Sequence, residues 1–242
     1  MSDPDDFDTS DIPTQKEIRM TTQEIDGVLV TVTDTEVQYE AGAAIDCDGA
    51  PNAYALPSSG HRGLDNIFNA LEDPRNTALN KYGDPIGPWA GVVTLADGTP
   101  YIQESGPFQG YCLSATALFD PHYPETDYRR FVDATRIAYI SIPPQLKALG
   151  VKLGDGALVA DRETGQSVQC IVADIGPRRR LGEVSVMAAQ CMGFVDSSPR
   201  TGGAGKGIIV RIFLGSASTP AWDSRRTQDN IAALVDAFAS VA

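Results

Sequence analysis

The chain has 242 residues, with 32 acidic and 19 basic side chains, so its formal net charge at pH 7 is -13. No apolar run approaches the roughly 20 residues that a membrane-spanning helix needs. Acidity of this size argues against nucleic-acid binding, which depends on clustered lysine and arginine. The four cysteines lie far apart and form no CxxC pair, which argues against a zinc site built from cysteine.

Most of the negative charge lies at the N-terminal end of the chain. Residues 1–48 hold 13 acidic and 2 basic side chains, whereas residues 49–242 hold 19 acidic and 17 basic ones. Residues 1–24 are polar and lack periodicity, so we expect an acidic flexible tail followed by one domain over residues 25–242. The first residues lack the basic and apolar segments of a signal peptide. Net charge therefore gives no argument for a cationic partner of the domain.

The first half of the chain predicts short strands and one helix. Residues 25–39 carry β-branched residues in rough alternation and predict one or two strands, and residues 44–54 break into a loop. Residues 63–73 have apolar residues at helical spacing, which predicts a short amphipathic helix. A hairpin with a tight Asp-Gly turn is expected over residues 89–103, followed by a strand over residues 110–118.

The second half gives stronger patterns. Residues 131–144 predict a strand that ends at proline, and residues 153–177 predict a β-hairpin. A short helix is expected over residues 184–193, a strand over residues 207–215 and an amphipathic helix over residues 229–241. Many short strands with few helices predict a mainly β fold, with a barrel or sandwich core.

Carboxylates are the main candidates for chemistry, because the only histidines, His61 and His122, lie in polar loops without a GxSxG motif. Asp174 ends an apolar run, where an unpaired carboxylate is costly to bury. Glu183 follows nine residues later, where a loop turns into the predicted helix. Two carboxyl groups at one cleft are the minimum for glycoside hydrolysis, since one donates a proton and the other activates water. The alternative is structural, with Asp174 capping a turn and Glu183 favouring a helix dipole.

A series of segments, taken in order and spacing, resembles the chitosanases of glycoside hydrolase family 75. The resemblance runs from about residue 43 to residue 217, roughly three quarters of the chain. The segments that carry it are AIDCDGAPNAY (44–54), GLDNIFNA (63–70), WAGVVT (89–94), PYIQ (100–103), GYCLSATAL (110–118), FVDATRIAYISIP (131–143), GVKLGDGALVADRETGQ (150–166), VADIGPRRRLGEVSVMAA (172–189) and GIIVRIFLG (207–215).

The resemblance implies that Asp174, in VADIGP, and Glu183, in LGEVS, are the two essential acidic residues. The family hydrolyses β-1,4 bonds between glucosamine units of chitosan with inversion, which requires carboxyl groups roughly 6.5–9.5 Å apart. No metal or organic cofactor is implied, and family members are usually secreted. The hairpin that ends at Asp174, the short helix after it and the strand over residues 207–215 are together also similar to one half of a double-psi β-barrel. The expected fold is therefore mainly β, with a six-stranded double-psi-like barrel core and a few short helices.

The roles of the two carboxyls can be predicted from their expected surroundings. Burial at the end of an apolar strand raises the pKa of a carboxyl, so we expect Asp174 to be the general acid. The dipole at a helix start favours an ionised carboxylate, so we expect Glu183 to be the base.

Substrate binding is predicted from the chemistry of a cationic sugar polymer, whose ammonium groups need carboxylates and whose sugar faces stack on aromatic rings. The predicted substrate-binding residues are Asp46, Asp48, Tyr54, Trp89, Tyr111 and Asp155. The alternatives are turn-forming roles for the aspartates and core packing for the aromatic residues. A monomer acting on a polysaccharide, without a nucleic-acid or membrane partner, is expected.

The chain departs from the family pattern in three respects. It shows no secretion leader, it has Ala55 where the family generally has a histidine after NAY, and it carries three consecutive arginines at residues 178–180. The arginines suit a cationic substrate poorly. Two alternatives therefore remain open: a peptidoglycan glycosidase exported without a leader, and a non-catalytic wall-binding barrel of the expansin type.

Overall fold

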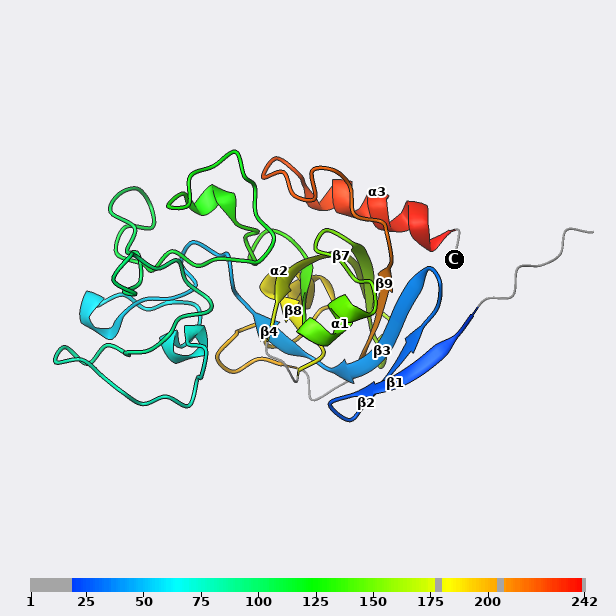
Figure 1. Cartoon of the computed structure of the whole chain (residues 1–242), viewed down its shortest axis with the longest axis horizontal. Helices are drawn as coiled ribbons and strands as arrows, with labels where there is room; N and C mark the ends of the chain where they lie inside the picture. Colours follow the sequence, from blue (N-terminus) through cyan, green and yellow to red (C-terminus); the bar gives the residue numbers. More distant parts are fainter. Residues whose placement is uncertain (1–18, 177–179, 204–206, 241–242) are drawn as a thin grey trace, which may run out of the picture.

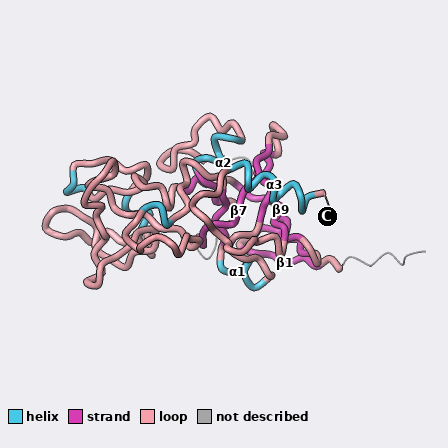
Figure 2. The backbone as a smooth tube through the Cα atoms, turned by 90° about the horizontal axis from the view of Figure 1, so that it is seen from above, coloured by secondary structure: helices cyan, strands magenta, loops and turns pink. Residues whose placement is uncertain are grey.

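A computed structural model describes residues 19–176, 180–203 and 207–240 (Figure 1). The fold is mainly β, as predicted. Within the described residues, nine strands form one mixed sheet that curls into a half-barrel, accompanied by three short α-helices. Figure 2 shows the strands gathered towards one end of the molecule and irregular loops at the other.

The sheet has the strand order β1-β2-β3-β9-β6-β7-β5-β8-β4. The strands are β1 (Thr21–Ile25), β2 (Val28–Val32), β3 (Glu36–Gly42), β4 (Ala44–Asp46), β5 (Tyr139–Ile142), β6 (Gly156–Asp161), β7 (Ser167–Ile175), β8 (Glu183–Ser185) and β9 (Gly207–Phe213). The helices are α1 (Pro144–Ala148), α2 (Val186–Cys191) and α3 (Gln228–Ala239). Pairing is antiparallel except between β5 and β7 and between β4 and β8.

The connection between β3 and β4 requires the sheet to curl. Only Ala43 separates these strands in the chain, yet they occupy the third and ninth positions of the sheet. A flat sheet with strands about 4.8 Å apart would separate them by roughly 29 Å, whereas consecutive Cα atoms are about 3.8 Å apart. The sheet therefore bends back towards itself, and this bend brings β4 to the same region as β7 and β8.

Alternating apolar residues of neighbouring strands fill the inside of the curled sheet. Tyr39 of β3 pairs with Val210 of β9, which pairs with Val159 of β6. Val37 and Ile212 form the next row, and all five side chains are almost completely buried. Burying one side chain of this size contributes about 1.5–3 kcal/mol, so these rows are a main source of stability for the curved sheet.

The N-terminal region holds more strand than the sequence predicted. The structure has three strands, β1 to β3, where one or two were expected over residues 25–39, and β1 begins at Thr21, inside the predicted tail. Asp26 and Gly27 have φ angles of 52° and 76°, which suit a tight hairpin turn. This turn pairs Ile25 with Val28 and so gives the residues before it a strand partner.

The helix predicted over residues 63–73 is wrong, since only Ile67–Ala70 form a short 3-10 turn. The apolar spacing instead reflects burial of Ile67 and Leu71, which are 4% and 2% exposed. Leu71 also forms an isolated β-bridge with Trp89, which is incompatible with continuing the helix. Packing against a neighbouring loop therefore outweighs the local helical pattern.

Residues 47–138 contribute no strand to the sheet and make up a loop-rich part beside it, on the left of Figure 1. The Asp97-Gly98 turn was predicted correctly, because the amide of Leu95 donates to the carbonyl of Thr99 at 2.8 Å. The predicted strands on either side are reduced to isolated bridges, such as that between Val92 and Ser114.

The second half of the chain follows its prediction closely. The hairpin of β6 and β7 and the strand β9 are confirmed, and the predicted strand before residue 144 is shortened to β5. The C-terminal helix is also confirmed as α3, where Thr227 and Asn230 form a capping box and Ile231 and Val235 are buried. Ser185 caps α2, so this helix starts later than predicted and residues 183–185 form β8.

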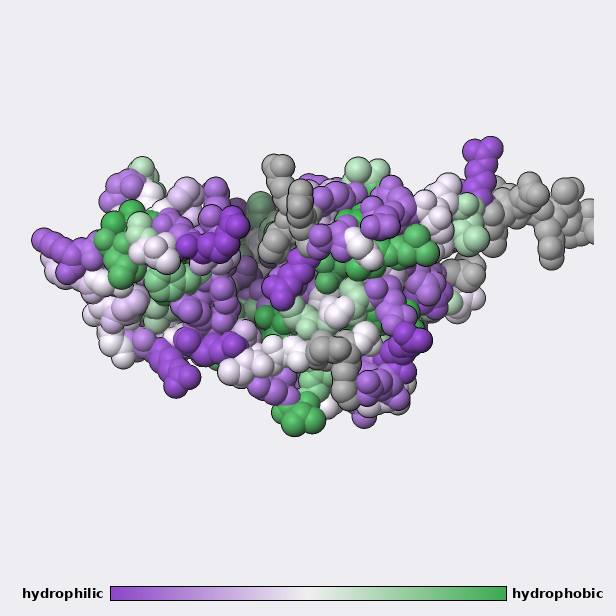
Figure 3. Space-filling view, turned by 90° about the horizontal axis from the view of Figure 1, so that it is seen from below, coloured by the Kyte–Doolittle hydropathy of each residue, from purple (hydrophilic) through white to green (hydrophobic). Residues whose placement is uncertain are grey.

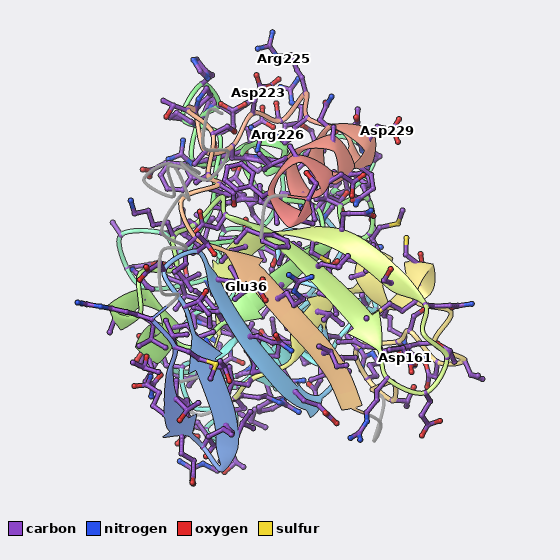
Figure 4. The ribbon with its side chains drawn as sticks, turned by 90° about the vertical axis from the view of Figure 1, so that its right-hand side faces the viewer. Glu36, Asp161, Asp223, Arg225, Arg226 and Asp229 are labelled. Carbon is purple, nitrogen blue, oxygen red and sulfur yellow. The ribbon has the colours of Figure 1, made fainter. Side chains whose placement is uncertain are left out.

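The outer face of the molecule carries ion pairs, both between strands and within a loop. Figure 4 shows Glu36 on the outside of the sheet, where Arg211 of β9 donates two hydrogen bonds to it at 2.8 and 2.6 Å. Asp223 and Arg225 lie together in the loop before α3 (Figure 4), where Arg225 Nη2 is 2.6 Å from Asp223 Oδ2. Among the helices that the structure describes, none has both the length and the apolar character needed to cross a bilayer.

Candidate active site

The strand order brings the two predicted catalytic carboxyls together. Ser141 of β5 pairs with Asp174 of β7 on one side and with Glu183 of β8 on the other. Directly paired residues of neighbouring strands point to the same face of a sheet. Asp174, Ser141 and Glu183 therefore form one row across three adjacent strands.

A β-bulge decides which residue of β7 joins this row. Ile140 pairs with Val172, but the next residue, Ser141, pairs with Asp174 rather than with Ala173. A shift of one residue exchanges the two faces of a strand. Without the bulge, Ala173 would stand opposite Ser141 and the carboxyl of Asp174 would point to the other face.

Gly176 leaves room for the Glu183 carboxylate. A Cβ atom at this position would lie 2.2 Å from Glu183 Oε2 and 2.9 Å from Ser141 Oγ. The Glu183 side chain thus leans over the backbone just beyond Asp174. The absence of a side chain at residue 176 is a geometric requirement of this arrangement.

Asp46 and Asp48 complete the group. Asp46 ends β4, which pairs in parallel with β8, and Asp48 follows in the next turn. One carboxylate oxygen from each of Asp46, Asp48 and Asp174 lies within 4.8 Å of the others. We call Asp46, Asp48, Asp174 and Glu183 the carboxyl cluster.

Protein donors hold one oxygen of each aspartate. Asp174 Oδ1 accepts a hydrogen bond from the Ala117 amide at 2.7 Å, and Asp46 Oδ1 accepts one from the Asp48 amide at 2.9 Å. Asp48 Oδ1 accepts from the Tyr54 hydroxyl at 2.7 Å and from the Ser114 hydroxyl at 3.3 Å. The loop-rich part therefore supplies donors that fix the cluster against the sheet.

Burial raises the pKa of every carboxyl in the cluster. The pKa of Asp174 rises from its ordinary value of 3.8 to about 7, chiefly by burial and then by the charge of Asp46. The pKa of Glu183 rises from 4.5 to about 8, also by burial and by the charge of Asp46, while the positive charge of Arg180 opposes the shift. The pKa of Asp46 rises to about 6, and that of Asp48 also rises well above its ordinary value. The cluster therefore holds protons near neutral pH.

The prediction that Glu183 lies at the start of a helix is wrong. Glu183 is the first residue of β8 and not part of a helix start, because α2 begins at Val186. The helix dipole therefore gives no reason to keep Glu183 ionised. Within the described residues no donor is hydrogen-bonded to it, and its nearest cation is Arg180, whose Nη1 lies 3.7 Å from Oε1. Arg178 and Arg179 lie outside the described residues.

Ser141 is a site residue that the sequence reasoning missed. Its side chain is 1% exposed, and its hydroxyl has no hydrogen-bond partner among the described residues although it adjoins Asp174 and Glu183. The available signal was its position as a polar residue inside the apolar segment YISI, which is buried throughout. Tyr139 of the same strand donates to the Asp48 carbonyl oxygen at 3.0 Å.

The other predicted substrate-binding residues have varied surroundings. Tyr54 is 3% exposed and reaches the cluster through its hydroxyl. Trp89 is half-buried in the loop-rich part, and Tyr111 is half-buried against His61, with ring centroids 4.9 Å apart. Asp155 does not offer a surface to a substrate, because it is fully buried and its oxygens accept hydrogen bonds from two backbone amides.

The surface is hollowed in the loop-rich part and at its border with the sheet (Figure 3). Figure 3 shows a hollow between the loop-rich part and the sheet. The loop-rich part also has an open surface hollow of about 1220 Å³, which Trp89 and Tyr101 help to line. Its lining includes four acidic residues, namely Glu72, Asp84, Asp97 and Glu104. The lining of this hollow is more apolar than polar and does not include the residues that carry the proposed chemistry, Asp174 and Glu183.

The chain matches no protein-family model, and comparison with curated proteins also gave no match. Function is therefore inferred from the carboxyl cluster and from the resemblance of the sequence segments described above.

Proposed function

We propose that the chain is an endo-acting glycoside hydrolase that cleaves β-1,4 bonds of chitosan with inversion. The observation that carries the proposal is the row of Asp174, Ser141 and Glu183 on one face of the sheet. Two strand spacings separate the Cα atoms of the two carboxyl residues by roughly 10 Å. This separation is compatible with carboxyl groups roughly 6.5–9.5 Å apart, the range that leaves room for a water molecule in an inverting reaction.

In the proposed reaction Glu183 is the general acid and Asp174 is the base, which reverses the roles expected from the sequence. Burial raises the pKa of Glu183, and this carboxyl accepts no hydrogen bond from the described residues that would favour its ionised form. Burial also raises the pKa of Asp174, but the Ala117 amide donates a hydrogen bond that stabilises the ionised form of this carboxyl. At neutral pH the proton therefore favours Glu183.

The proton transfers balance in a single displacement. Asp174 accepts a proton from water as the water oxygen bonds to the anomeric carbon, and the glycosidic bond to the leaving oxygen breaks. Glu183 gives its proton to that leaving oxygen. Exchange with solvent then removes the proton from Asp174 and returns one to Glu183. Asp46 and Asp48 are proposed to bind the ammonium group of a glucosamine unit.

We also propose that β4 to β9 are a variant of the double-psi β-barrel. Support comes from the six-strand order β9-β6-β7-β5-β8-β4, with two parallel pairs among antiparallel ones, and from the return of β4 to the end of β3. Secretion and a monomeric state remain predictions that follow from the family resemblance.

The test is the release of reducing ends from chitosan and from peptidoglycan by the purified protein, Asp174→Asn and Glu183→Gln. We expect chitosan to be cleaved by the wild type and both variants to lose at least about 100-fold in kcat. Asp73→Asn is the matched control, because this exposed aspartate pairs only with Arg75. Wild-type activity in both cluster variants would overturn the proposal. An activated leaving group should rescue Glu183→Gln and not Asp174→Asn if the roles are assigned correctly.

The same assay separates the alternatives. Cleavage of peptidoglycan alone would support a wall glycosidase, for which the guanidinium of Arg180 beside Glu183 offers a contact to an anionic glycan. No reducing ends from either polymer, together with binding to cell walls, would support the expansin-like alternative.

A further inference from the structure

Three aspartates of the carboxyl cluster form a compact set of oxygen ligands. Oxygens from Asp46, Asp48 and Asp174 all lie within 4.8 Å of one another. Calcium binds carboxylate oxygens at 2.3–2.6 Å, so two oxygens on opposite sides of one ion are about 4.6–5.2 Å apart. The three oxygens can therefore contact one calcium ion without movement of the backbone.

The three side chains come from different parts of the fold and are held in place before any ion binds. Asp46 belongs to β4, Asp48 to the turn after it, and Asp174 to the bulged part of β7. Each uses its Oδ1 atom to accept a hydrogen bond from the protein. Such fixed orientation lowers the cost of ordering the ligands when a cation binds.

A buried hydroxyl without a partner among the described residues is an independent feature that points to ligand binding. Ser141 is 1% exposed, and its Oγ forms no hydrogen bond of ordinary geometry with the described residues, although it lies near enough to Asp174 to lower the pKa of that carboxyl. Ser141 pairs directly with Asp174 and shares its face of the sheet, so its hydroxyl adjoins the cluster. Buried polar groups normally have a partner, and a bound ion or a water molecule on that ion would supply one.

Few positive charges lie near the carboxyl cluster. The cluster brings together four carboxyls, while one guanidinium, that of Arg180, lies at its edge 3.7 Å from Glu183 in the described part of the chain. Buried charges are normally paired or bound to metal. We propose that Asp46, Asp48 and Asp174 bind one divalent cation of the calcium type, with the Ser141 hydroxyl beside it.

The cation site does not depend on the proposed hydrolysis, and its direct readout is binding. If both hold, a cation on Asp174 occupies the residue that activates water, so calcium inhibits cleavage. The probe is terbium, a calcium substitute whose emission is sensitised by nearby tyrosine rings. Tyr54 and Tyr139 both donate hydrogen bonds to Asp48 and lie close enough to sensitise it.

The experiment titrates the full chain, freed of metals, with terbium and then displaces terbium with calcium. We expect one saturable site per chain, with a calcium Kd between roughly 10⁻⁵ and 10⁻³ M. Asp48→Asn and Asp46→Asn should each weaken binding at least about 10-fold, whereas Asp73→Asn should leave it unchanged. Thermal unfolding without metal verifies that each variant is folded.

Two outcomes would overturn the cation site. One is the absence of saturable, calcium-displaceable emission from the folded wild type. The other is equal affinity in the wild type and both cluster variants, which would mean that the ion binds elsewhere, for example to the acidic residues near the N-terminus. Loss of chitosan cleavage together with intact terbium binding would reject only the proposed hydrolase.

Discussion

Gly176→Ala tests the position of the Glu183 carboxylate. The new Cβ atom would lie 2.2 Å from Glu183 Oε2, well inside the contact distance of about 3.4 Å. Either the carboxylate or the backbone must therefore move by at least about 1 Å. The carboxylate is the end of a flexible side chain, so it is the part that yields.

The substitution should cost little stability. Gly176 does not have a positive φ angle, so alanine can adopt its backbone conformation. A compatible glycine-to-alanine change alters the free energy of unfolding by less than about 1 kcal/mol and often raises it. The amide of residue 176 still donates its hydrogen bond to the Ile142 carbonyl, which is 3.0 Å away in the structure.

Activity should fall much more than stability. A displacement of about 1 Å at a catalytic group costs on the order of 100-fold in rate, which corresponds to about 2.7 kcal/mol in the activation free energy. We expect kcat on chitosan to decrease by about this factor while KM changes less than threefold. The measurements are initial rates of reducing-end release and the free energy of unfolding in denaturant.

Gly207→Ala is the matched control for this prediction. Gly207 also lacks a positive φ angle, and a Cβ there would lie 2.8 Å from Oε1 of Glu40, another flexible carboxylate. Glu40 pairs with Arg162 on the surface and is not a member of the carboxyl cluster. A folded Gly176→Ala protein with the activity of the wild type would refute the claim that the Glu183 position matters. Equal losses in both variants would attribute the effect to the sheet as a whole.

Three further variants test the surroundings of the cluster. The pKa of Asp174 is raised from 3.8 to about 7 in the folded protein, so the wild type should lose stability as pH rises from 4 through 7. Without metal, Asp174→Asn should therefore be more stable than the wild type at pH 8, by up to roughly 4 kcal/mol in the free energy of unfolding. A difference between the two proteins that does not change with pH in denaturant titrations would contradict this. Asp155→Ala leaves the part-buried amides of Lys152 and Ala217 without their acceptor and should lower the free energy of unfolding by about 1–3 kcal/mol without changing KM. A raised KM in a stable protein would restore the predicted role of Asp155 in binding. Tyr54→Phe removes the 2.7 Å hydrogen bond to Asp48 and should raise KM for chitosan several-fold at nearly unchanged kcat, an outcome that an unchanged KM would exclude.

The sequence identified the residues of the site better than their arrangement. An acidic residue at the end of an apolar strand is unusual enough to single out Asp174. The pairing of Asp174 with Ser141 depends on the bulge at Ala173, and no local pattern in the segment CIVADI marks that extra residue. Ser141 was missed because its importance comes from two neighbouring strands that lie more than 30 residues later in the chain.

Local structure was predictable where one face of an element is buried by a regular partner. The β6 and β7 hairpin and α3 satisfy this condition, and both were predicted correctly. The loop-rich part does not, because its residues are buried by contacts between irregular segments, as with Leu71 and Trp89. In the loop-rich part, the spacing of apolar residues indicates which residues are buried but not which secondary structure they form.

The carboxyl cluster is a poor arrangement for stability, which is itself an argument for function. Burial opposes ionisation of Asp46, Asp174 and Glu183, and their mutual repulsion opposes it further. Asparagine or glutamine at the same places would keep many of the hydrogen bonds without the charge. A fold of this size has enough apolar core to be stable without such a group. Strained or costly arrangements concentrate at sites that bind or transform a ligand, so the cost of this cluster supports the proposal that it has a function.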